Sequence, residues 1–307
     1  MTAKLIFATR PSALARWQTG FIINQLKTEW PNMLCEEEII ITKGDQVLDK
    51  PLPEIGGKGL FTLELEAALL EGRVDAAVHS LKDLPTQDAP GLTIAVIPER
   101  ADARDILISP SGHLLGELPS TAFVGTSSQR RSAQLLAYRR DLSTRSIRGN
   151  VDTRIQKIRA GQYQAGILAA AGVIRLGLQE HITQYLPLDI MMPAPGQGAL
   201  AVQCRAGDEE TLRWLRPLEH TPTRLAVTAE RAFLTALGGG CSLPVGAIAR
   251  KNNLQIEMRG VVAAPDGSCL LRVSASGSQP QVLGEQLAQH ALEQGAGELI
   301  ALENPRG

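Results

Sequence analysis

Short apolar runs alternate with helix-like stretches over the first two thirds of the chain. The segment at 4–9, KLIFAT, is typical of a buried strand, and Ser12 follows it as a suitable N-cap for a helix with apolar residues at near-helical spacing. Further strands are expected at 36–44, 74–80, 121–125, 144–148 and 165–171, with polar turns and helices between them. Strands that alternate with helices in this way predict parallel, doubly wound sheets.

A stretch without periodicity separates the second of these strands from a helix expected at 61–71. It reads GDQVLDKPLPEIGGKG, occupies positions 44–59 and has sixteen residues, several of them glycine or proline. Loops of this length inside a compact domain are often lids. We therefore expect a lid in this part of the chain.

The pattern changes near Thr221, where Thr-Pro supplies an N-cap and a proline for the first turn of a helix. Shortly before this point, PAPGQGALAVQC (193–204) resembles a hinge followed by a returning strand. After it, three strands at 245–251, 254–264 and 268–275 are joined by turns that contain NN and PDG, and a last helix begins near 281. This segment predicts a small α+β domain.

The chain of 307 residues has a formal charge of −1, but its basic residues are concentrated in one region. Between 126 and 162, nine arginines and lysines stand against two aspartates, a local charge of +7. Aromatic residues make up only 4% of the chain and no nucleic-acid recognition motif is present, so small polycarboxylates are favoured over nucleic acid as ligands. Within this region we expect Arg139, Arg140, Arg145 and Arg159 to lie on solvated helix faces.

Other charged residues fall where predicted strands end and helices begin. They are Arg10, Asp83, Arg130, Arg131 and Arg148. In a doubly wound sheet the ligand crevice lies outside the carboxyl ends of the strands. Arginines at a helix start oppose the helix dipole, so Arg130, Arg131, Arg148 and Arg154 are unfavourable there without an anionic partner. Bound carboxylates would supply that partner.

The residues alone leave the roles of Cys241 and Asp83 open. The four cysteines are too far apart for a disulfide framework or a zinc site, and Cys241 follows three glycines beyond a helix-like segment. The negative end of that helix disfavours a thiolate and no histidine is close in sequence, which argues against a cysteine hydrolase. Cys241 is either a buried structural cysteine or a reactive thiol. Asp83, in HSLKDLP, is either a helix cap, a partner of Lys82 or a functional carboxylate.

Nine segments in order resemble the porphobilinogen deaminase (hydroxymethylbilane synthase) family. They are ATRPSALARWQ, KGD, GGKGLF, AVHSLKDLP, GTSSQRR, IRGNVDTR, ILAAAG with RLGL, PAPGQGA and GGGCSLPVG, and they cover nearly the whole chain. The resemblance implies a transferase of tetrapyrrole and heme biosynthesis. Such an enzyme joins four porphobilinogen molecules head to tail into hydroxymethylbilane and releases four ammonia. It is primed by a covalently bound dipyrromethane cofactor.

The resemblance also implies an α/β fold with two doubly wound lobes like those of type II periplasmic binding proteins, followed by a small α+β domain with a three-stranded antiparallel sheet. We expect a first domain at 1–98 and 199–216 that carries the catalytic aspartate. A second, arginine-rich domain is expected at 104–192, and a third, which carries the cysteine, at 221–307.

Residue by residue, the resemblance implies that Asp83 is the central catalytic carboxylate and that Cys241 anchors the cofactor through a thioether. The other cofactor-binding residues it implies are Ser12, Lys82, Thr126, Ser128, Arg130, Arg131, Arg148 and Gly149. The substrate-binding residues it implies are Arg10, Arg148, Arg154, Arg175, Lys58, Phe61 and Gln197. Glu54 departs from the family, which often has lysine there, and Pro11, Ala13 and Arg16 depart from the first motif.

The family is typically monomeric, and the chain has no sign of a signal peptide or membrane span, so a cytoplasmic monomer without metal, membrane or nucleic-acid partners is expected. The main alternative is a two-lobed anion-binding protein without catalysis. That alternative would require neither Cys241 nor the small third domain.

Overall fold

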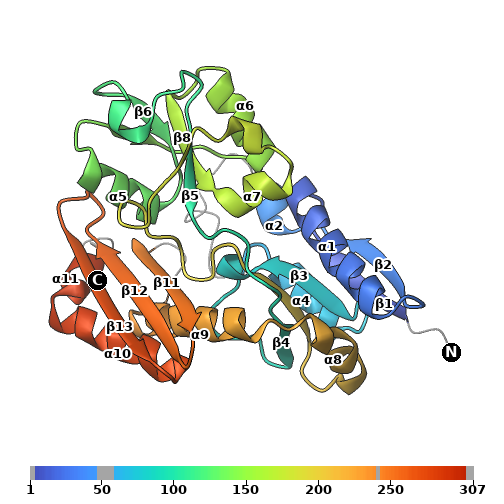
Figure 1. The fold of residues 1–307 in the computed structure, drawn as a ribbon. Helices are drawn as coiled ribbons and strands as arrows, with labels where there is room; N and C mark the ends of the chain where they lie inside the picture. The colour runs from blue at the N-terminus through green and yellow to red at the C-terminus, as the bar shows by residue number, and fades with distance from the viewer. Residues whose placement is uncertain (1–3, 47–58, 240–242, 302–307) are drawn as a thin grey trace. The chain divides into compact units, whose positions relative to one another are not determined.

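The computed structural model describes residues 4–46, 59–239 and 243–301. The chain divides into two compact units, one formed by Met1–Arg100 with Ala199–Arg224 and the other by Ala101–Gly198 with Leu225–Gly307 (Figure 1). Each unit is described by itself. In the described residues, no helix is both long enough and apolar enough to cross a membrane.

The first unit is built on a five-stranded sheet in the order β2-β1-β3-β10-β4. Its strands are β1 (Lys4–Thr9), β2 (Leu34–Ile39), β3 (Ala76–Ser80), β4 (Leu92–Val96) and β10 (Leu200–Arg205). Strands β2, β1 and β3 are parallel, whereas β10 returns from far along the chain and pairs antiparallel with β3 and β4.

Helices cover both faces of this sheet. Successive strand residues point to opposite sides, so the apolar side chains on each face need a helix to pack against. Val78 of β3 packs with Ile22 and Leu26 of α1 (Ala13–Glu29), and Ala77 packs with the helix α4 (Leu63–Leu70). The Ser12 side chain caps α1 by accepting a hydrogen bond from the Ala15 N–H, as its position predicts. The short helix α2 (Lys43–Gln46) and α8 (Glu209–Leu215) complete the unit.

The second unit contains a sheet with the same arrangement, in the order β7-β6-β8-β5-β9. Its strands are β5 (Asp105–Ile108), β6 (Phe123–Gly125), β7 (Ser143–Arg145), β8 (Ala165–Ala169) and β9 (Gln184–Tyr185). Strands β7, β6 and β8 are parallel, and β5 is antiparallel to β8 and β9. The helices are α5 (Gln129–Tyr138), α6 (Val151–Arg159) and α7 (Ala170–Arg175).

Both sheets are therefore mixed, whereas the alternation of strands and helices predicts parallel ones. The antiparallel strands β5 and β10 do not follow their sheet neighbours in sequence, so no crossover helix requires them to run parallel. The strands β4, β5 and β9 are not predicted from the hydrophobic pattern. The helices α7, α8 and α11 (Ala296–Ala301) are also missed. The strand expected at 36–44 lies at 34–39 instead.

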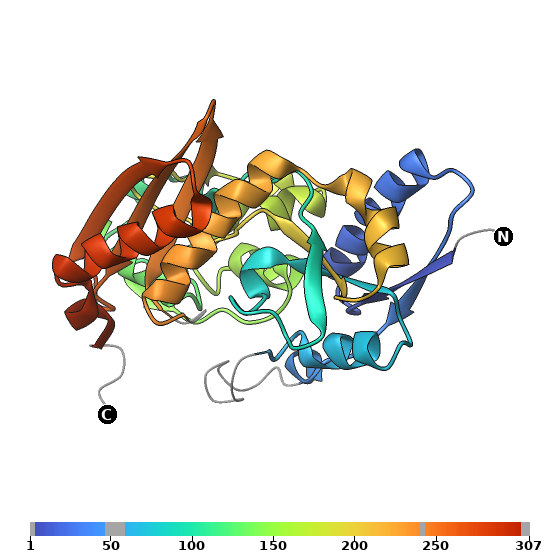
Figure 2. The same cartoon turned by 90° about the horizontal axis from the view of Figure 1, so that it is seen from below.

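The last part of the second unit is an antiparallel sheet in the order β11-β12-β13, with helices packed against it (Figure 2). Its elements are α9 (Thr221–Ala236), β11 (Val245–Asn252), β12 (Gln255–Ala263), β13 (Leu270–Gly277), α10 (Pro280–Glu293) and α11 (Ala296–Ala301). Phe233 of α9 is fully buried against Gly260 of β12, and Leu287 of α10 joins the same core. The predicted fold class, two α/β lobes and a small α+β domain, is confirmed.

Candidate functional site

Within the first unit, a pocket opens at the carboxyl ends of β1 and β3. Arg10 comes directly after β1, and Asp83 ends a single turn of 3-10 helix that follows β3. The pocket is lined by Arg10, Ser12, Leu14, Ala15, Gln18, Phe61, Thr62, Val78, His79, Ser80 and Asp83. Of the residues predicted from sequence, Arg10, Ser12, Phe61 and Asp83 are thus brought together in one pocket.

Arg10 is held in this pocket by a residue to which sequence reasoning assigns no role. Its guanidinium contacts the Asp45 carboxylate twice, Nη2 to Oδ1 at 2.5 Å and Nε to Oδ2 at 3.2 Å, and lies 4.1 Å from the centre of the Phe61 ring. Burial would raise the pKa of Asp45, but hydrogen bonds from Arg10 and Thr42 outweigh it and hold the pKa below its ordinary value. Asp45 follows Gly44 at the start of the predicted lid, and only its place in the KGD motif marks it.

The Asp83 carboxylate is not contacted by any polar group in the described part of the protein. Its side chain is exposed and makes no hydrogen bond or ion pair with any described residue. Ser80, in the same turn, accepts a hydrogen bond from Gln18 at 2.8 Å, which joins α1 to the end of β3. The carboxylate is therefore available to a ligand in the pocket.

His79 also lines the pocket, although sequence reasoning assigns it no role. It is 5% exposed, and its Nε2 has no hydrogen-bond partner among the described residues. Burial lowers its pKa to about 4, and the positive charge of Arg10 lowers it further. The imidazole is therefore neutral at pH 7.

In the second unit, hydroxyl groups and arginines gather at the N-terminus of α5. Ser128 is the N-cap, and its Oγ accepts a hydrogen bond from the Arg131 N–H at 3.4 Å. The Thr126 hydroxyl lies next to it and accepts from the Ser128 N–H at 3.2 Å. The end of α5 thus offers side-chain hydroxyls together with the positive end of the helix dipole.

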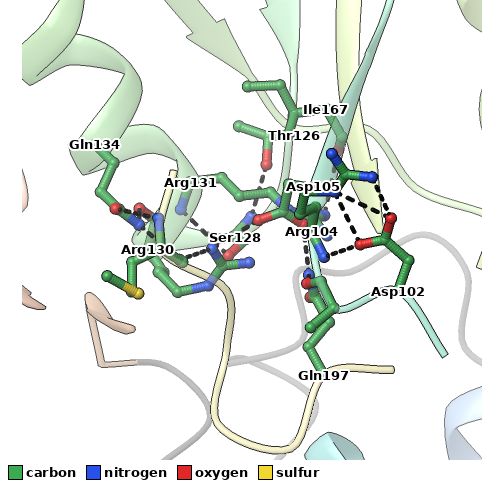
Figure 3. Close-up of polar contacts among 12 residues, drawn as sticks. Asp102, Arg104, Asp105, Thr126, Ser128, Arg130, Arg131, Gln134, Ile167 and Gln197 are labelled. Carbon is green, nitrogen blue, oxygen red and sulfur yellow. Dashed lines mark hydrogen bonds and ion pairs between the residues drawn. The ribbon is translucent and has the colours of Figure 1, made fainter. Parts of the chain in front are cut away.

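Arg130 and Arg131 already have one internal anion at this helix start, which the sequence does not reveal. Both donate to the carboxylate of Asp105, the first residue of β5, and all three side chains are buried (Figure 3). Burial would raise the pKa of Asp105, but the charges of the two arginines outweigh it and hold the pKa far below its ordinary value. Burial lowers the pKa of Arg130.

Arg148 and Gly149 lie in the turn that leads into α6, and Arg154 lies within α6 near its start. The half-buried side chain of Arg148 has no partner among the described residues, while Arg154 Nε donates to the Gly149 carbonyl at 2.7 Å. Gly149 has a φ of +111°, and a Cβ there would lie 2.9 Å from the Thr153 side chain. A glycine is therefore required for this turn.

Arg175 contacts the segment that closes the second unit before residue 199, and Gln197 belongs to that segment. Arg175 Nη2 donates to the Gly198 carbonyl at 2.8 Å, and burial lowers its pKa to about 10. The Gln197 amide donates to Asp105 at 2.9 Å and to the Ala103 carbonyl at 2.7 Å. Both residues have their side chains directed into the fold of this unit.

A buried carboxylate that sequence reasoning missed joins this segment to the C-terminal sheet. Glu230 of α9 accepts hydrogen bonds from the Gly196 N–H at 2.7 Å and the Ala249 N–H at 2.8 Å. Because two backbone donors are satisfied by one buried side chain, the segment around residue 196 is fastened to both α9 and β11.

Other residues predicted from the sequence lie outside the pocket or outside the described part of the chain. Lys58, Glu54 and Cys241 lie outside the described residues, as does most of the predicted lid. Lys82 is half-buried at the pocket end of β3. Arg139 is not a solvated arginine, because it pairs with Asp141 and donates to the carbonyls of Leu115, Gly116 and Leu118.

Fold and site together define a two-lobed α/β protein with a small C-terminal α+β domain and polar, largely basic groups at the strand ends. The chain belongs to the porphobilinogen deaminase family. Residues 5–213 match the family model "Porphobilinogen deaminase, dipyromethane cofactor binding domain". Residues 224–293 match the model "Porphobilinogen deaminase, C-terminal domain".

Curated relatives agree over nearly the full length. The porphobilinogen deaminase of Brevibacillus brevis is 50% identical over 294 residues, which cover 95% of this chain and 95% of the relative. That of Roseiflexus castenholzii is 49% identical over 302 residues, or 98% of this chain and 100% of the relative. The predicted family and enzyme class are confirmed, and the alternative of a non-catalytic anion-binding protein is not favoured.

Proposed function

We propose that this chain joins four porphobilinogen molecules head to tail into hydroxymethylbilane, with the loss of four ammonia, using Asp83 as the catalytic carboxylate. The observation that carries the proposal is about 50% identity to named porphobilinogen deaminases over nearly the whole chain. The pocket supports it, because it offers a carboxylate without a partner among the described residues beside a cationic side chain.

The chemistry requires a negative charge beside the reacting pyrrole. When the aminomethyl C–N bond breaks, the bonding pair leaves with the nitrogen as ammonia once the amine is protonated, and the pyrrole keeps a delocalised positive charge. An adjacent pyrrole carbon then forms the new C–C bond and loses its proton. Asp83 can accept hydrogen bonds from pyrrole N–H groups and stabilise the cation, and it can pass a proton to the leaving amine.

The basic residues bind the acid side chains of the pyrroles. Every porphobilinogen unit carries an acetate and a propionate group, so a growing chain needs many cationic partners. Arg148 has no partner among the described residues and is half-buried, which suits a charge-assisted contact with a carboxylate. We assign contacts with the cofactor or the growing pyrrole chain to Arg10, Ser12, Lys58, Phe61, Lys82, Thr126, Ser128, Arg130, Arg131, Gly149, Arg154, Arg175 and Gln197.

These donors also fit a dipyrromethane, whose four carboxylates match hydroxyls at a helix N-terminus and nearby guanidinium groups. When bound, the cofactor supplies the free pyrrole carbon to which the first substrate unit is joined. We propose that Cys241 holds it through a thioether, because GGGCSLPVG matches the family motif and lies in the connection between α9 and β11.

Intact-mass spectrometry of the purified protein tests this assignment. The native chain should carry the added mass of two pyrrole units, and Cys241→Ser should lack it. Cys269→Ser is the matched control, because Cys269 is an exposed cysteine of the same domain and its loss should leave the added mass in place. Addition of porphobilinogen should produce further steps of one pyrrole unit. A fully active protein with unmodified Cys241 would reject the proposal.

The resemblance further supports a cytoplasmic monomer with no nucleic-acid or membrane partner. Light scattering after size-exclusion chromatography should give a mass close to that of a single chain, 32.9 kDa. A stable dimer would contradict this part of the proposal without affecting the assignment of the reaction.

A further inference from the structure

Asp105, which no family motif includes, lies at the centre of a buried polar cluster. Its Oδ2 accepts from Arg130 Nη1 at 2.7 Å, and its Oδ1 accepts from Arg131 Nη2 at 2.8 Å, from Arg131 Nε at 3.1 Å and from Gln197 Nε2 at 2.9 Å. The residue is 0% exposed. Figure 3 shows the two arginines approaching it from α5 and Gln197 approaching it from a separate segment of the chain.

The two arginines use this carboxylate differently. Arg131 donates through all three of its nitrogens, because Nη1 bonds the Ile167 carbonyl at 3.2 Å while Nε and Nη2 bond Asp105. Arg130 donates through Nη1 alone, to Asp105 and to the Met192 carbonyl. Nε and Nη2 of Arg130 have no acceptor among the described residues.

A second residue fixes the backbone group that Arg130 contacts. Gln134, one turn further along α5, donates to the Met192 carbonyl at 3.0 Å and accepts from the Met192 N–H at 2.7 Å. The Met192 backbone, whose carbonyl accepts from Arg130 Nη1, is therefore itself held by two hydrogen bonds with the Gln134 amide. This leaves Arg130 with one end fixed and one side of its guanidinium unused.

The charges in the cluster do not balance. Two guanidinium groups share one carboxylate, so a positive charge is left over where the side chains of Arg130 and Arg131 are only 5% and 8% exposed. A buried charge without a full complement of partners is costly, and a further carboxylate would remove the imbalance.

We propose that Asp105 is a positioning residue of this enzyme, which holds Arg130 by Nη1 so that Nε and Nη2 can take a carboxylate of the bound pyrrole chain. Asp105 does not touch the ligand in this arrangement and acts through Arg130. Arg131 and Gln197 keep the carboxylate in place. The inference rests on the proposed function, because the partner it assigns to Arg130 is a carboxylate of the bound pyrrole chain.

A double-mutant cycle of Asp105→Asn and Arg130→Gln tests the inference. We measure kcat and KM for porphobilinogen per molecule that carries the two-pyrrole mass, together with the loaded fraction and the melting temperature. Loss of a charge-assisted contact should lower kcat/KM by about 10- to 100-fold for Asp105→Asn. In the Arg130→Gln background the same change should cost less than about threefold, because its target is gone.

Asp102→Asn is the matched control. Asp102 lies three positions from Asp105 and also binds an arginine, Arg104, with Nη2 to Oδ2 at 2.6 Å, but it does not contact the α5 pair (Figure 3). Its kcat/KM should stay within about twofold of the native value. If Asp105→Asn does not fold, Gln134→Met replaces it, and should lower kcat/KM by about threefold or more only when Arg130 is present.

The outcomes separate the two proposals. If the native chain neither makes hydroxymethylbilane nor carries the two-pyrrole mass, the proposed function fails. If the native chain is active but the two losses multiply in the double variant, the positioning role alone fails. Arg130→Gln could itself carry no two-pyrrole mass, in which case the cycle is read from the loaded fraction instead. The folded Asp105→Asn variant should then carry the two-pyrrole mass on a smaller fraction of molecules than the Asp102→Asn control. Equal fractions would overturn the inference.

Discussion

Arg10 and Asp45 form a two-point ion pair, with Nη2 and Oδ1 at 2.5 Å and Nε and Oδ2 at 3.2 Å, across 35 positions of sequence. The Phe61 ring lies against the same guanidinium, 4.1 Å from its central carbon. The arginine at the end of β1 is therefore fixed on two sides before any ligand arrives. Such prior orientation reduces the entropy lost when a carboxylate binds.

We expect Asp45→Asn to lower kcat/KM for porphobilinogen by about tenfold, because Arg10 loses its charged partner but not its neighbour Phe61. The folded-state pKa of Asp45 lies below its ordinary value, so this residue adds stability at neutral pH. That stability begins to fall below the unfolded pKa of about 4 and is lost as pH falls through the lower folded-state pKa. Urea unfolding at pH 7 and pH 3 checks this. The stability gap between native and variant should shrink at the lower pH, and a constant gap would contradict the ion-pair explanation.

Asp83→Asn should nearly stop turnover while the fold and the two-pyrrole mass remain. Removing the charge that faces the pyrrole cation should cost about 100-fold or more in kcat. The control is Asp88→Asn, five positions further on and also exposed, which should keep near-native kcat. Turnover by Asp83→Asn at a rate close to the native one would reject the catalytic assignment, provided that its melting temperature is unchanged.

The two arginines Arg148 and Arg140 should differ strongly. Arg148 is half-buried without a partner among the described residues, whereas Arg140 is exposed and makes one long contact, 3.4 Å, to the Ser268 carbonyl. Arg148→Leu should reduce kcat/KM by about 10- to 100-fold, and Arg140→Leu by less than about twofold. Steady-state kinetics on both variants decides, and equal losses would undo the distinction between them.

His79 should make the protein less stable in mild acid. Its pKa is about 4 in the folded state and about 6.5 when unfolded, so the unfolded state binds more protons between these values and stability falls as pH drops below 6.5. The loss from this group should be about 2–3 kcal/mol at pH 4.5. Between pH 7 and pH 4.5, His79→Gln should lose less stability than the native chain. The control His290→Gln, at an exposed histidine, should lose as much stability as the native chain. Chemical denaturation at both pH values measures the difference.

Local patterns were sufficient to predict much of this molecule. The strand at β1, the Ser12 cap, the helix α5 and the three-stranded C-terminal sheet depend on alternation, capping and turn chemistry within a few residues of each other. The family motifs add Asp83 and Arg10, and the structure brings both to one pocket. Strands β5 and β9 were missed because they are short and pair with distant segments.

The partners of the charged residues could not be predicted in this way. A run of basic residues between 126 and 162 indicates an anion, but it does not show that Asp105, more than twenty positions upstream, already supplies one to Arg130 and Arg131. Arg139 was expected on a solvated face for the same reason, and it caps three carbonyls instead.

The sequence by itself determined the order of elements, the enzyme family and the placement of Arg10 and Asp83 at strand ends, because these follow from short-range periodicity and from motifs. Only the tertiary structure decided that β10 and β5 insert antiparallel into their sheets, that Asp45 pairs with Arg10 and that Asp105 pairs with Arg130. These pairings depend on contacts between segments that are remote in sequence. The burial and the charge balance of each residue are set there by neighbours in space, which a local sequence pattern does not identify.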